Sequence, residues 1–154
     1  MSDAGTPLIR DPGYTLVTLA HHHDIQVVPI PGACALIAAL SAAGVPTDVF
    51  TFGGFLPTTT ATRQSALKAF QEMHQTLIFY ESTHRLQSTL NDIAAVFGDK
   101  AILVLAKELT KAFETIKRDS VAAIQAWLNA DSARIKGEFV LIIPPTKQSK
   151  DTLT

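Results

Sequence analysis

Cysteine is nearly absent from this 154-residue sequence, where Cys34 is the single one. One cysteine excludes a disulfide framework and is typical of a reducing compartment, so we expect a cytoplasmic protein. A long uninterrupted apolar run is also missing, because prolines and glycines divide the most hydrophobic stretch, residues 27–45. That stretch predicts a strand, a turn and a helix rather than a membrane span, and we expect no membrane partner.

An excess of charge of one sign is absent as well. The formal net charge is -1 at pH 7, so any nucleic-acid contact has to come from a local patch rather than from a global field. The motif Gly-x-Ser-x-Gly is missing, which argues against a serine hydrolase. His21, His22 and His23 are consecutive on a predicted helix and point about 100° apart, so they do not converge on one ion and we predict no metal site.

Strand-like and helix-like segments alternate along most of the sequence. Apolar and β-branched runs predict strands at residues 25–30, 50–55, 76–80, 101–106, 114–118 and 137–143. Helical patterns lie at residues 12–22, 33–43, 58–73, 82–97 and 119–129. This alternation indicates an α/β layered sheet. The helix at residues 33–43 is almost entirely apolar, so we expect it to be buried.

The sequence divides into two blocks of unequal completeness. The block up to residue 48 has too few strands to form a sheet alone, and residues 44–48 resemble a linker. We therefore predict an incomplete first domain at residues 1–48 and a complete αβα domain at residues 49–146. Residues 147–154 are polar and predict a flexible tail. We expect the chain to be the later part of a larger protein.

A short turn rich in glycine, proline and acid opens the sequence. Ser2-Asp3-Ala4-Gly5-Thr6-Pro7 is followed by Asp11-Pro12-Gly13-Tyr14. Glycine lets the backbone approach a ligand closely, and proline fixes the entry into a helix. An ordinary surface loop uses the same residues. Asp3-x-Gly5-Thr6 also resembles the phosphate-binding turns of actin-like ATPases and, more loosely, the aspartate loops of phosphatases.

Three further motifs lie at the ends of strands or the beginnings of helices. Pro31-Gly32-Ala33-Cys34-Ala35 precedes a helix, whose free N–H groups can hold a carboxylate or phosphate. Phe79-Tyr80-Glu81-Ser82-Thr83-His84-Arg85 and Lys107-Glu108-Leu109-Thr110-Lys111 follow predicted strands, where open α/β sheets bind ligands. Each also has a plain interpretation, as a small buried cysteine, a helix cap or solvated charges.

Taken in order, these motifs resemble one family, the bacterial 16S rRNA 2′-O-ribose methyltransferases of the tetrapyrrole-methylase superfamily. The resemblance runs from residues 2–7, through Phe-Gly-Gly-Phe-Leu-Pro at residues 52–57, to Gly-Glu-Phe-Val at residues 137–140. It implies two αβα domains, S-adenosylmethionine in the cleft between them, and a homodimer. The implied product is a cytidine methylated on its ribose in 16S rRNA of the small ribosomal subunit.

Two features depart from the family's pattern. The family begins with a strand and a glycine-rich loop upstream of the turn that opens this chain. Because both are missing, we expect the chain by itself to be nearly or wholly inactive. Arg10 stands where the family pattern has a small polar residue, and this departure is either harmless or an added RNA contact.

The resemblance and the residue chemistry together nominate site residues. The resemblance assigns the cofactor loop and a tyrosine of the second domain to S-adenosylmethionine: Ser2, Asp3, Ala4, Gly5, Thr6, Pro7 and Tyr80. Methyl transfer requires alignment of the 2′-hydroxyl and removal of its proton, for which the candidates are Glu81, His84, Lys107 and Glu108. A local phosphate-binding patch is predicted at Arg63, Lys68, Arg85 and Lys111.

Two other functions stay open at this point. One is a related methylase that acts on a tetrapyrrole or another small molecule. The other is a phosphate-handling ATPase or phosphatase built on Asp3-x-Gly5-Thr6, which would need further acids and a metal.

Overall fold

The computed structural model describes residues 4–146. Its helices are α1 (Tyr14–His22), α2 (Ala35–Ala42), α3 (Thr60–Gln71), α4 (Thr83–Phe97) and α5 (Val121–Asn129). Its strands are β1 (Phe50–Gly54), β2 (Thr76–Ser82), β3 (Ile102–Lys107), β4 (Thr115–Ser120) and β5 (Glu138–Ile143). From residue 50 onward these elements confirm the sequence predictions, with boundaries shifted by a few residues. Among the helices in this range, none has both the length and the apolar character needed to cross a bilayer.

The described strands form one five-stranded sheet in the order β1-β2-β5-β3-β4. β1 and β2 are parallel and the other neighbours are antiparallel. The carboxyl ends of β1, β2 and β3 therefore lie at the same edge as the amino ends of β4 and β5, and we call this the functional edge. In the register, Phe139 of β5 lies between Glu81 and Lys107. The α/β layered sheet is confirmed, and the topology brings two predicted ligand motifs to one edge.

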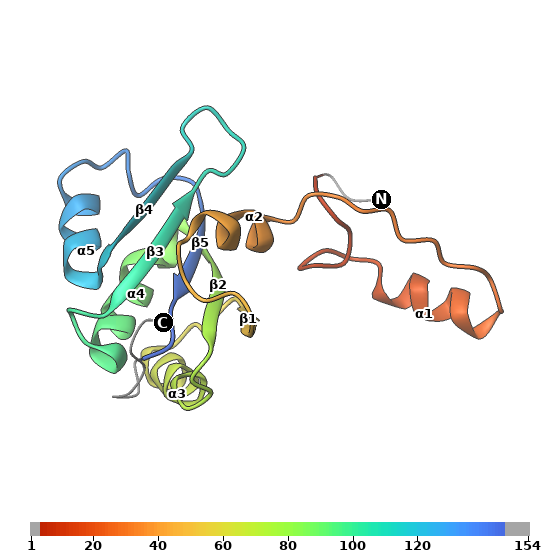
Figure 1. Cartoon of the computed structure of the whole chain (residues 1–154), viewed down its shortest axis with the longest axis horizontal. Helices are drawn as coiled ribbons and strands as arrows, with labels where there is room; N and C mark the ends of the chain where they lie inside the picture. Colours follow the sequence, from red (N-terminus) through yellow and green to blue (C-terminus); the bar gives the residue numbers. More distant parts are fainter. Residues whose placement is uncertain (1–3, 147–154) are drawn as a thin grey trace, which may run out of the picture.

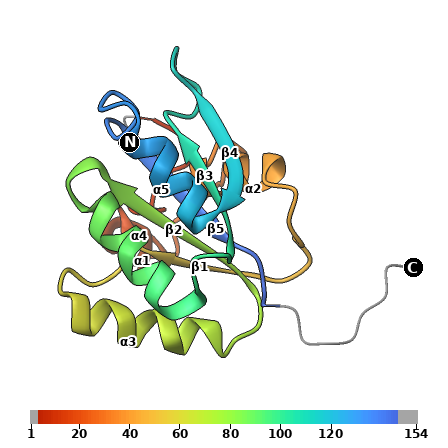
Figure 2. The ribbon, with the colours of Figure 1, turned by 90° about the vertical axis from the view of Figure 1, so that its left-hand side faces the viewer.

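Alternation along the strands divides the core into two layers. On one face, residues such as Phe79, Leu105 and Leu141 pack beneath α3, α4 and α5, which cover the sheet in Figure 2. On the other face, residues such as Ile78 and Val104 pack against α2. Within the described residues, α3, α4 and α5 thus cover one face of the sheet, and the short helix α2 covers the other.

Side-chain caps begin two of the helices. Thr59 Oγ1 accepts a hydrogen bond from Thr62 N at 3.4 Å at the start of α3, and Ser120 Oγ accepts one from Ala123 N at 3.2 Å at the start of α5. Each cap satisfies a backbone donor that the first helical turn leaves free. Thr59 and Ser120 therefore fix where α3 and α5 begin.

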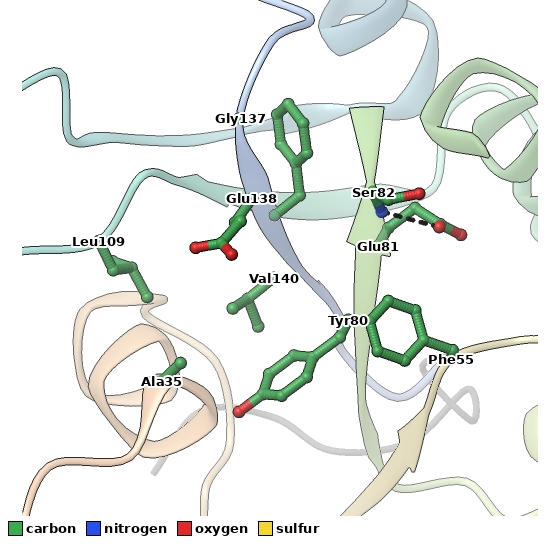
Figure 3. Close-up of a pocket in the computed structure, with 10 residues that line it drawn as sticks. Ala35, Phe55, Tyr80, Glu81, Ser82, Leu109, Gly137, Glu138 and Val140 are labelled. Atoms are coloured by element: carbon green, nitrogen blue, oxygen red, sulfur yellow. Dashed lines mark hydrogen bonds between the residues drawn. The ribbon is translucent and has the colours of Figure 1, made fainter. Parts of the chain in front are cut away.

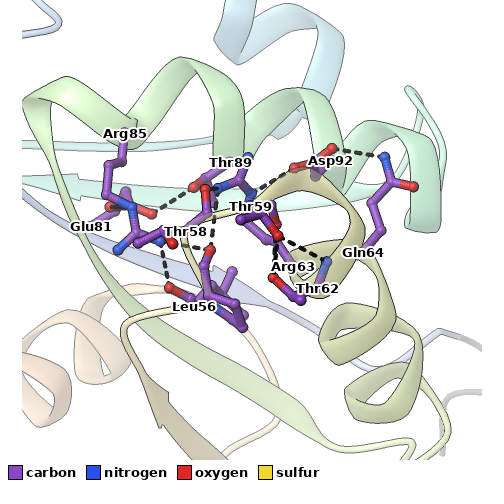
Figure 4. Close-up of polar contacts among 11 residues, drawn as sticks. Leu56, Thr58, Thr59, Thr62, Arg63, Gln64, Glu81, Arg85, Thr89 and Asp92 are labelled. Atoms are coloured by element: carbon purple, nitrogen blue, oxygen red, sulfur yellow. Dashed lines mark hydrogen bonds and ion pairs between the residues drawn. The ribbon is translucent and has the colours of Figure 1, made fainter.

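A buried ion pair ties α3 to α4 (Figure 4). Arg63 Nε lies 2.6 Å from Asp92 Oδ2, and the two side chains are 3% and 5% exposed. The same guanidinium donates to the carbonyl oxygens of Pro57 and Thr58, and Gln64 donates to the second Asp92 oxygen at 2.8 Å. The predicted phosphate contact of Arg63 is not supported by this position, because its burial against Asp92 gives the guanidinium a packing role.

The segment between α1 and α2 differs most from its prediction. The sequence predicts a strand at residues 25–30, but the structure has no regular element there. Ile25, Val28 and Ile30 are 60%, 63% and 76% exposed, and this part of the chain extends away from the sheet in Figure 1. A strand requires a neighbouring strand to pair with, and the described residues offer none at this place.

α2 is less buried than its apolar composition predicts. Leu36, Ala39 and Leu40 pack on the sheet, whereas Ile37 is 49% exposed. The expectation of a fully buried helix is wrong because α2 forms a single layer with no described element on its outer side. α2 also rests on strands that follow residue 48, and the domain boundary there stays a prediction.

Candidate functional site

The opening turn lies against the loop that precedes α2. Thr6 N donates to the carbonyl oxygen of Ala33 at 2.7 Å, and Thr6 Oγ1 donates to the same oxygen at 3.1 Å. Gly5 has φ +70°, and a Cβ atom there would approach Ala33 O to 2.9 Å, so glycine permits this contact. Ala4 and Pro7 are exposed beside it, while Ser2 and Asp3 lie outside the described residues. Two separate ligand motifs of the sequence therefore form one wall.

Tyr80 joins the end of β2 to the beginning of α2. Its hydroxyl oxygen accepts a hydrogen bond from Leu36 N at 3.1 Å. Its ring makes edge-to-face contacts with Phe52 and Phe55, at centroid distances of 4.8 and 6.1 Å. Burial raises the pKa of Tyr80 above its ordinary value, and the bond from Leu36 opposes that shift. The phenol is therefore protonated at neutral pH and holds α2 against the functional edge.

A cavity of ≈ 330 Å³ opens beside Tyr80. Figure 3 shows the rings of Tyr80 and Phe55 on one side of it, Ala35 and Leu109 on the other, and the Glu138 carboxylate nearby. Small-molecule sites are typically apolar hollows with a few polar groups that fix orientation. The composition of this cavity meets that description, and we call it the tyrosine cavity.

Glu81 lies at the rim of the tyrosine cavity but its carboxylate is already engaged. The residue is 3% exposed, one carboxylate oxygen accepts from Ser82 N at 2.8 Å, and the other accepts from Thr89 Oγ1 at 2.6 Å. Arg85 Nε lies 3.8 Å away (Figure 4). A general base has to reach the proton that it removes. These contacts favour a role in holding the beginning of α4 over the predicted catalytic role.

Arg85 fixes the loop that carries Phe55. Its Nη2 donates to the carbonyl oxygens of Leu56 and Pro57, the latter at 2.9 Å. The side chain is 26% exposed. Arg85 therefore anchors one wall of the tyrosine cavity through backbone contacts, and its predicted phosphate contact remains untested.

Lys107 is the last residue of β3, and Glu108 follows it outside the strand with φ +52°. Lys107 is 8% exposed and its Nζ donates to Ala133 O at 3.0 Å on the side of α5. Glu108 Oε1 accepts from Glu138 N at 2.7 Å and from Lys111 Nζ at 3.2 Å. The sequence predicts both as parts of one site. In the structure both line one hollow at the functional edge, and each polar group is engaged by a neighbour.

The remaining predicted residues are spread over the surface. His84 is exposed in the first turn of α4. Lys111 is near the functional edge and pairs with Glu138 at 2.8 Å. Lys68 lies in the last turn of α3, and α3 leads from the end of β1 to the start of β2, so Lys68 is near the opposite edge. The predicted phosphate patch is therefore not gathered in one place.

Glu108 provides a pH-dependent contribution to stability. The hydrogen bond from the Glu138 backbone, followed by the contact with Lys111, holds the pKa of Glu108 below its ordinary value. A carboxyl whose pKa is lowered on folding stabilises the fold above its unfolded pKa of about 4.3 and loses that contribution as pH falls through the folded pKa. We expect Glu108→Gln to flatten the acid limb of a plot of unfolding free energy against pH. Glu72→Gln, at an exposed carboxyl beyond α3, is the control, and an unchanged acid limb in Glu108→Gln would contradict the assignment.

Several residues that line the site are not identified by any pattern in the sequence. Arg10 was noted in the sequence only because it differs from the family pattern. In the structure its guanidinium carbon lies 5.0 Å from the Phe55 ring centroid. Glu138 and Leu109 stand inside quoted motifs, but only the sheet register shows that both line the tyrosine cavity. Within residues 4–146, no group of three or more histidine, cysteine or acidic side chains is arranged to hold a metal ion.

Comparison with known proteins finds similar sequences and similar folds. The family model described as tetrapyrrole (corrin/porphyrin) methylases matches residues 1–125. A ribosomal RNA small subunit methyltransferase I of Escherichia coli O157:H7 is 53% identical over 153 residues, which are 99% of this chain and 54% of the relative. Its counterpart in Pseudomonas aeruginosa is 54% identical over 143 residues, 93% of this chain and 51% of the relative. The chain spans about half the length of the curated relatives it matches.

Two solved structures illustrate the fold likeness. The methyltransferase CobJ matches with a TM-score of 0.65 at 16% identity, over 96% of this chain and 64% of its own. A diphthine synthase matches with a TM-score of 0.64 at 11% identity, over 91% of this chain and 57% of its own. At such identities the likeness shows the fold alone.

Proposed function

The chain belongs to the tetrapyrrole (corrin/porphyrin) methylase family, and from this premise we propose that it serves S-adenosylmethionine-dependent 2′-O-methylation of a cytidine ribose in 16S rRNA. The observation that carries the proposal is the 53% identity, over 99% of this chain, to a relative named for methylation of small-subunit ribosomal RNA. The family match includes the opening turn, so we do not adopt the phosphate-handling interpretation of Asp3-x-Gly5-Thr6.

We propose that the cofactor lies between the tyrosine cavity and the wall formed by the opening turn and the loop that precedes α2. The absence of a Cβ at Gly5 lets the opening turn lie against Ala33, where Thr6 is hydrogen-bonded, and this places exposed backbone near the start of α2. Tyr80 and Phe55 offer aromatic rings, which attract a cation such as a sulfonium. When bound, S-adenosylmethionine supplies a methyl group on positively charged sulfur. The fit rests on this pairing of close backbone and aromatic wall.

The chain's own residues contribute mainly positioning. Arg85 and Glu81 hold the Phe55 loop and the beginning of α4, so they shape the cavity rather than meet the reacting atoms. Of the proposed bases, Glu81, Lys107 and Glu108 have their polar atoms bound by neighbours. His84 is exposed near the functional edge, and histidine is the most frequent general base in enzymes. We therefore favour His84 among the four for further test.

The exposed apolar segment at residues 25–30 fits a place in a larger sheet. Relatives are about twice as long as this chain, and we propose that strands of their other half pair with this segment. We also propose a homodimer, as the family resemblance implies. Both proposals explain how the exposed side chains of Ile25, Val28 and Ile30 would leave water.

Cofactor binding should distinguish this chain alone from the same chain joined to the upstream half of a relative. We expect the chain alone to show no saturable binding of S-adenosylmethionine in calorimetry, because it spans only about half the length of its relatives. Joining the upstream half of the Escherichia coli relative to its amino end should restore binding and transfer of labelled methyl groups to assembled small subunits. Saturable binding by the chain alone would contradict the first expectation. Transfer to a tetrapyrrole but not to RNA by the joined protein would contradict the proposed function.

A further inference from the structure

A second hollow lies at the functional edge, on the side covered by α5. Its volume is ≈ 670 Å³, and its wall includes the end of β3, the β3–β4 loop, α5 and the segment that follows α5. Gly137 lines both this hollow and the tyrosine cavity. The two spaces therefore meet at the backbone near Gly137. We call the second space the basic hollow, after Lys107, Arg134 and Lys136 in its wall.

One aromatic side chain on the rim has almost no packing within the fold. Phe113, in the β3–β4 loop, is 80% exposed, the highest value among the exposed large hydrophobic residues of the described chain. Exposing a phenyl ring costs hydrophobic free energy. Exposed rings beside cationic grooves are the platforms on which single-stranded nucleic acids stack their bases.

A guanidinium is held in place across the hollow. The Arg134 guanidinium carbon lies 4.7 Å from the Trp127 ring centroid, and Nη1 donates to the Trp127 carbonyl oxygen at 2.8 Å. Asp131 lies 3.9 Å from Nε, and Lys117 approaches the same indole at 5.6 Å. Because these contacts exist before a ligand arrives, ordering the arginine adds little entropic cost to binding.

The two acids in the wall are already bound within the loop. Glu108 Oε1 accepts from Glu138 N at 2.7 Å and from Lys111 at 3.2 Å, and Glu114 Oε2 accepts from Thr110 N at 2.6 Å. Lys111 offsets the charge of Glu108, whereas the Thr110 amide orients the Glu114 carboxylate and leaves its charge in place. Lys136 is exposed at the same wall, so Arg134 and Lys136 are the groups able to meet an anion.

We propose that the basic hollow holds single-stranded RNA, with one base stacked on Phe113 and neighbouring phosphates on Arg134 and Lys136. An adjoining ribose would then reach the tyrosine cavity across Gly137, so this inference rests on the proposed function and names the RNA-docking surface of that site. An acidic peptide would match the cations but leave the Phe113 ring exposed. The combination of exposed ring and fixed guanidinium therefore favours RNA.

Trp127 supplies a built-in reporter for this proposal. It is the single tryptophan of the sequence and lines the basic hollow, so its fluorescence should change as RNA enters. We would titrate the chain with a short single-stranded RNA of mixed sequence and follow the anisotropy of a labelled copy in parallel. Saturable changes in both signals are expected. Phe113→Ala should weaken binding about tenfold, and Lys136→Gln should lower the salt dependence by about one phosphate contact.

Matched variants separate docking from general effects. Tyr14→Ala removes another exposed ring, 76% exposed on α1, and Lys100→Gln removes another exposed lysine; both should bind RNA as the unaltered chain does. Undiminished binding by Phe113→Ala, or competition by polyglutamate as strong as by RNA, would overturn the proposal. The assay needs no methyl transfer. RNA docking without methylation by the joined protein would therefore refute the proposed function alone, and methylation with no effect of Phe113→Ala would refute this inference alone.

Discussion

Replacing Asp92 with alanine is expected to lower the free energy of unfolding by about 3–5 kcal/mol, since it leaves a buried charge unpaired. Arg63 is 2% exposed, and its Nε lies 2.6 Å from the Asp92 carboxylate. The remaining partners of the guanidinium are the carbonyl oxygens of Pro57 and Thr58, which do not neutralise it. Urea unfolding followed by circular dichroism measures the loss.

Two further variants test the cause of that loss. The double variant Arg63→Met with Asp92→Leu removes both charges, and buried pairs replaced by apolar residues often cost little. We expect it to be markedly more stable than Asp92→Ala alone. Asp99→Ala, at an exposed acid just after α4, should change stability by less than about 0.5 kcal/mol. If Asp92→Ala lowered the free energy of unfolding no more than Asp99→Ala, the buried ion pair would not stabilise the fold.

Replacing Phe79 with alanine is expected to destabilise the fold by about 3–5 kcal/mol through loss of buried area and the cavity left behind. Phe79 is fully buried in the layer beneath α3 and α4. Its ring packs edge-to-face on Phe70 at a centroid distance of 5.1 Å. Thermal and urea unfolding of the purified variant would measure the effect.

A substitution at Gly53 tests whether the Phe79 ring fills the space next to residue 53. A Cβ atom at Gly53 would lie 2.8 Å from Phe79 Cδ1 and 3.0 Å from Phe70 Cζ, so Gly53→Ala alone should cost about 1–3 kcal/mol by overpacking. In the Phe79→Ala background, the added methyl group enters the vacated space. The combined loss should therefore be smaller than the sum of the two single losses. Strict additivity would mean that the Phe79 ring does not restrict residue 53.

The sequence predicted those elements whose partners lie within the described chain. β1, β2, β3 and β5 are rich in apolar residues and pair with other strands, so composition and pairing agree, and the polar strand β4 pairs with β3 at the side of the sheet. Residues 25–30 have the same β-branched composition but no neighbour, and they form no strand. The helix at residues 33–43 was predicted to be buried because it is almost entirely apolar. Apolar content shows that a helix can be buried, but it does not show whether another layer covers its outer side. Local pattern was therefore reliable only where tertiary pairing supported it.

For the candidate site, strand ends predicted which motifs lie together, whereas charge alone did not predict which side chains are buried in ion pairs. The motifs around Tyr80 and Lys107 were expected near ligands, and the register brings both to one edge. Arg63 was assigned to RNA from its charge, but its partner Asp92 is distant in the sequence and no local pattern identifies it.

The position of β5 governs when this fold can be completed. β5 is the last of the described strands in the sequence, yet it lies in the middle of the sheet and pairs with both β2 and β3. During synthesis, β1–β2 and β3–β4 therefore wait as two separate pairs until residues 138–143 emerge. Until then β2 and β3 each present an unpaired edge, which invites pairing with other chains. The order of translation thus makes the final strand the closing step of folding and the period before it the most vulnerable to aggregation.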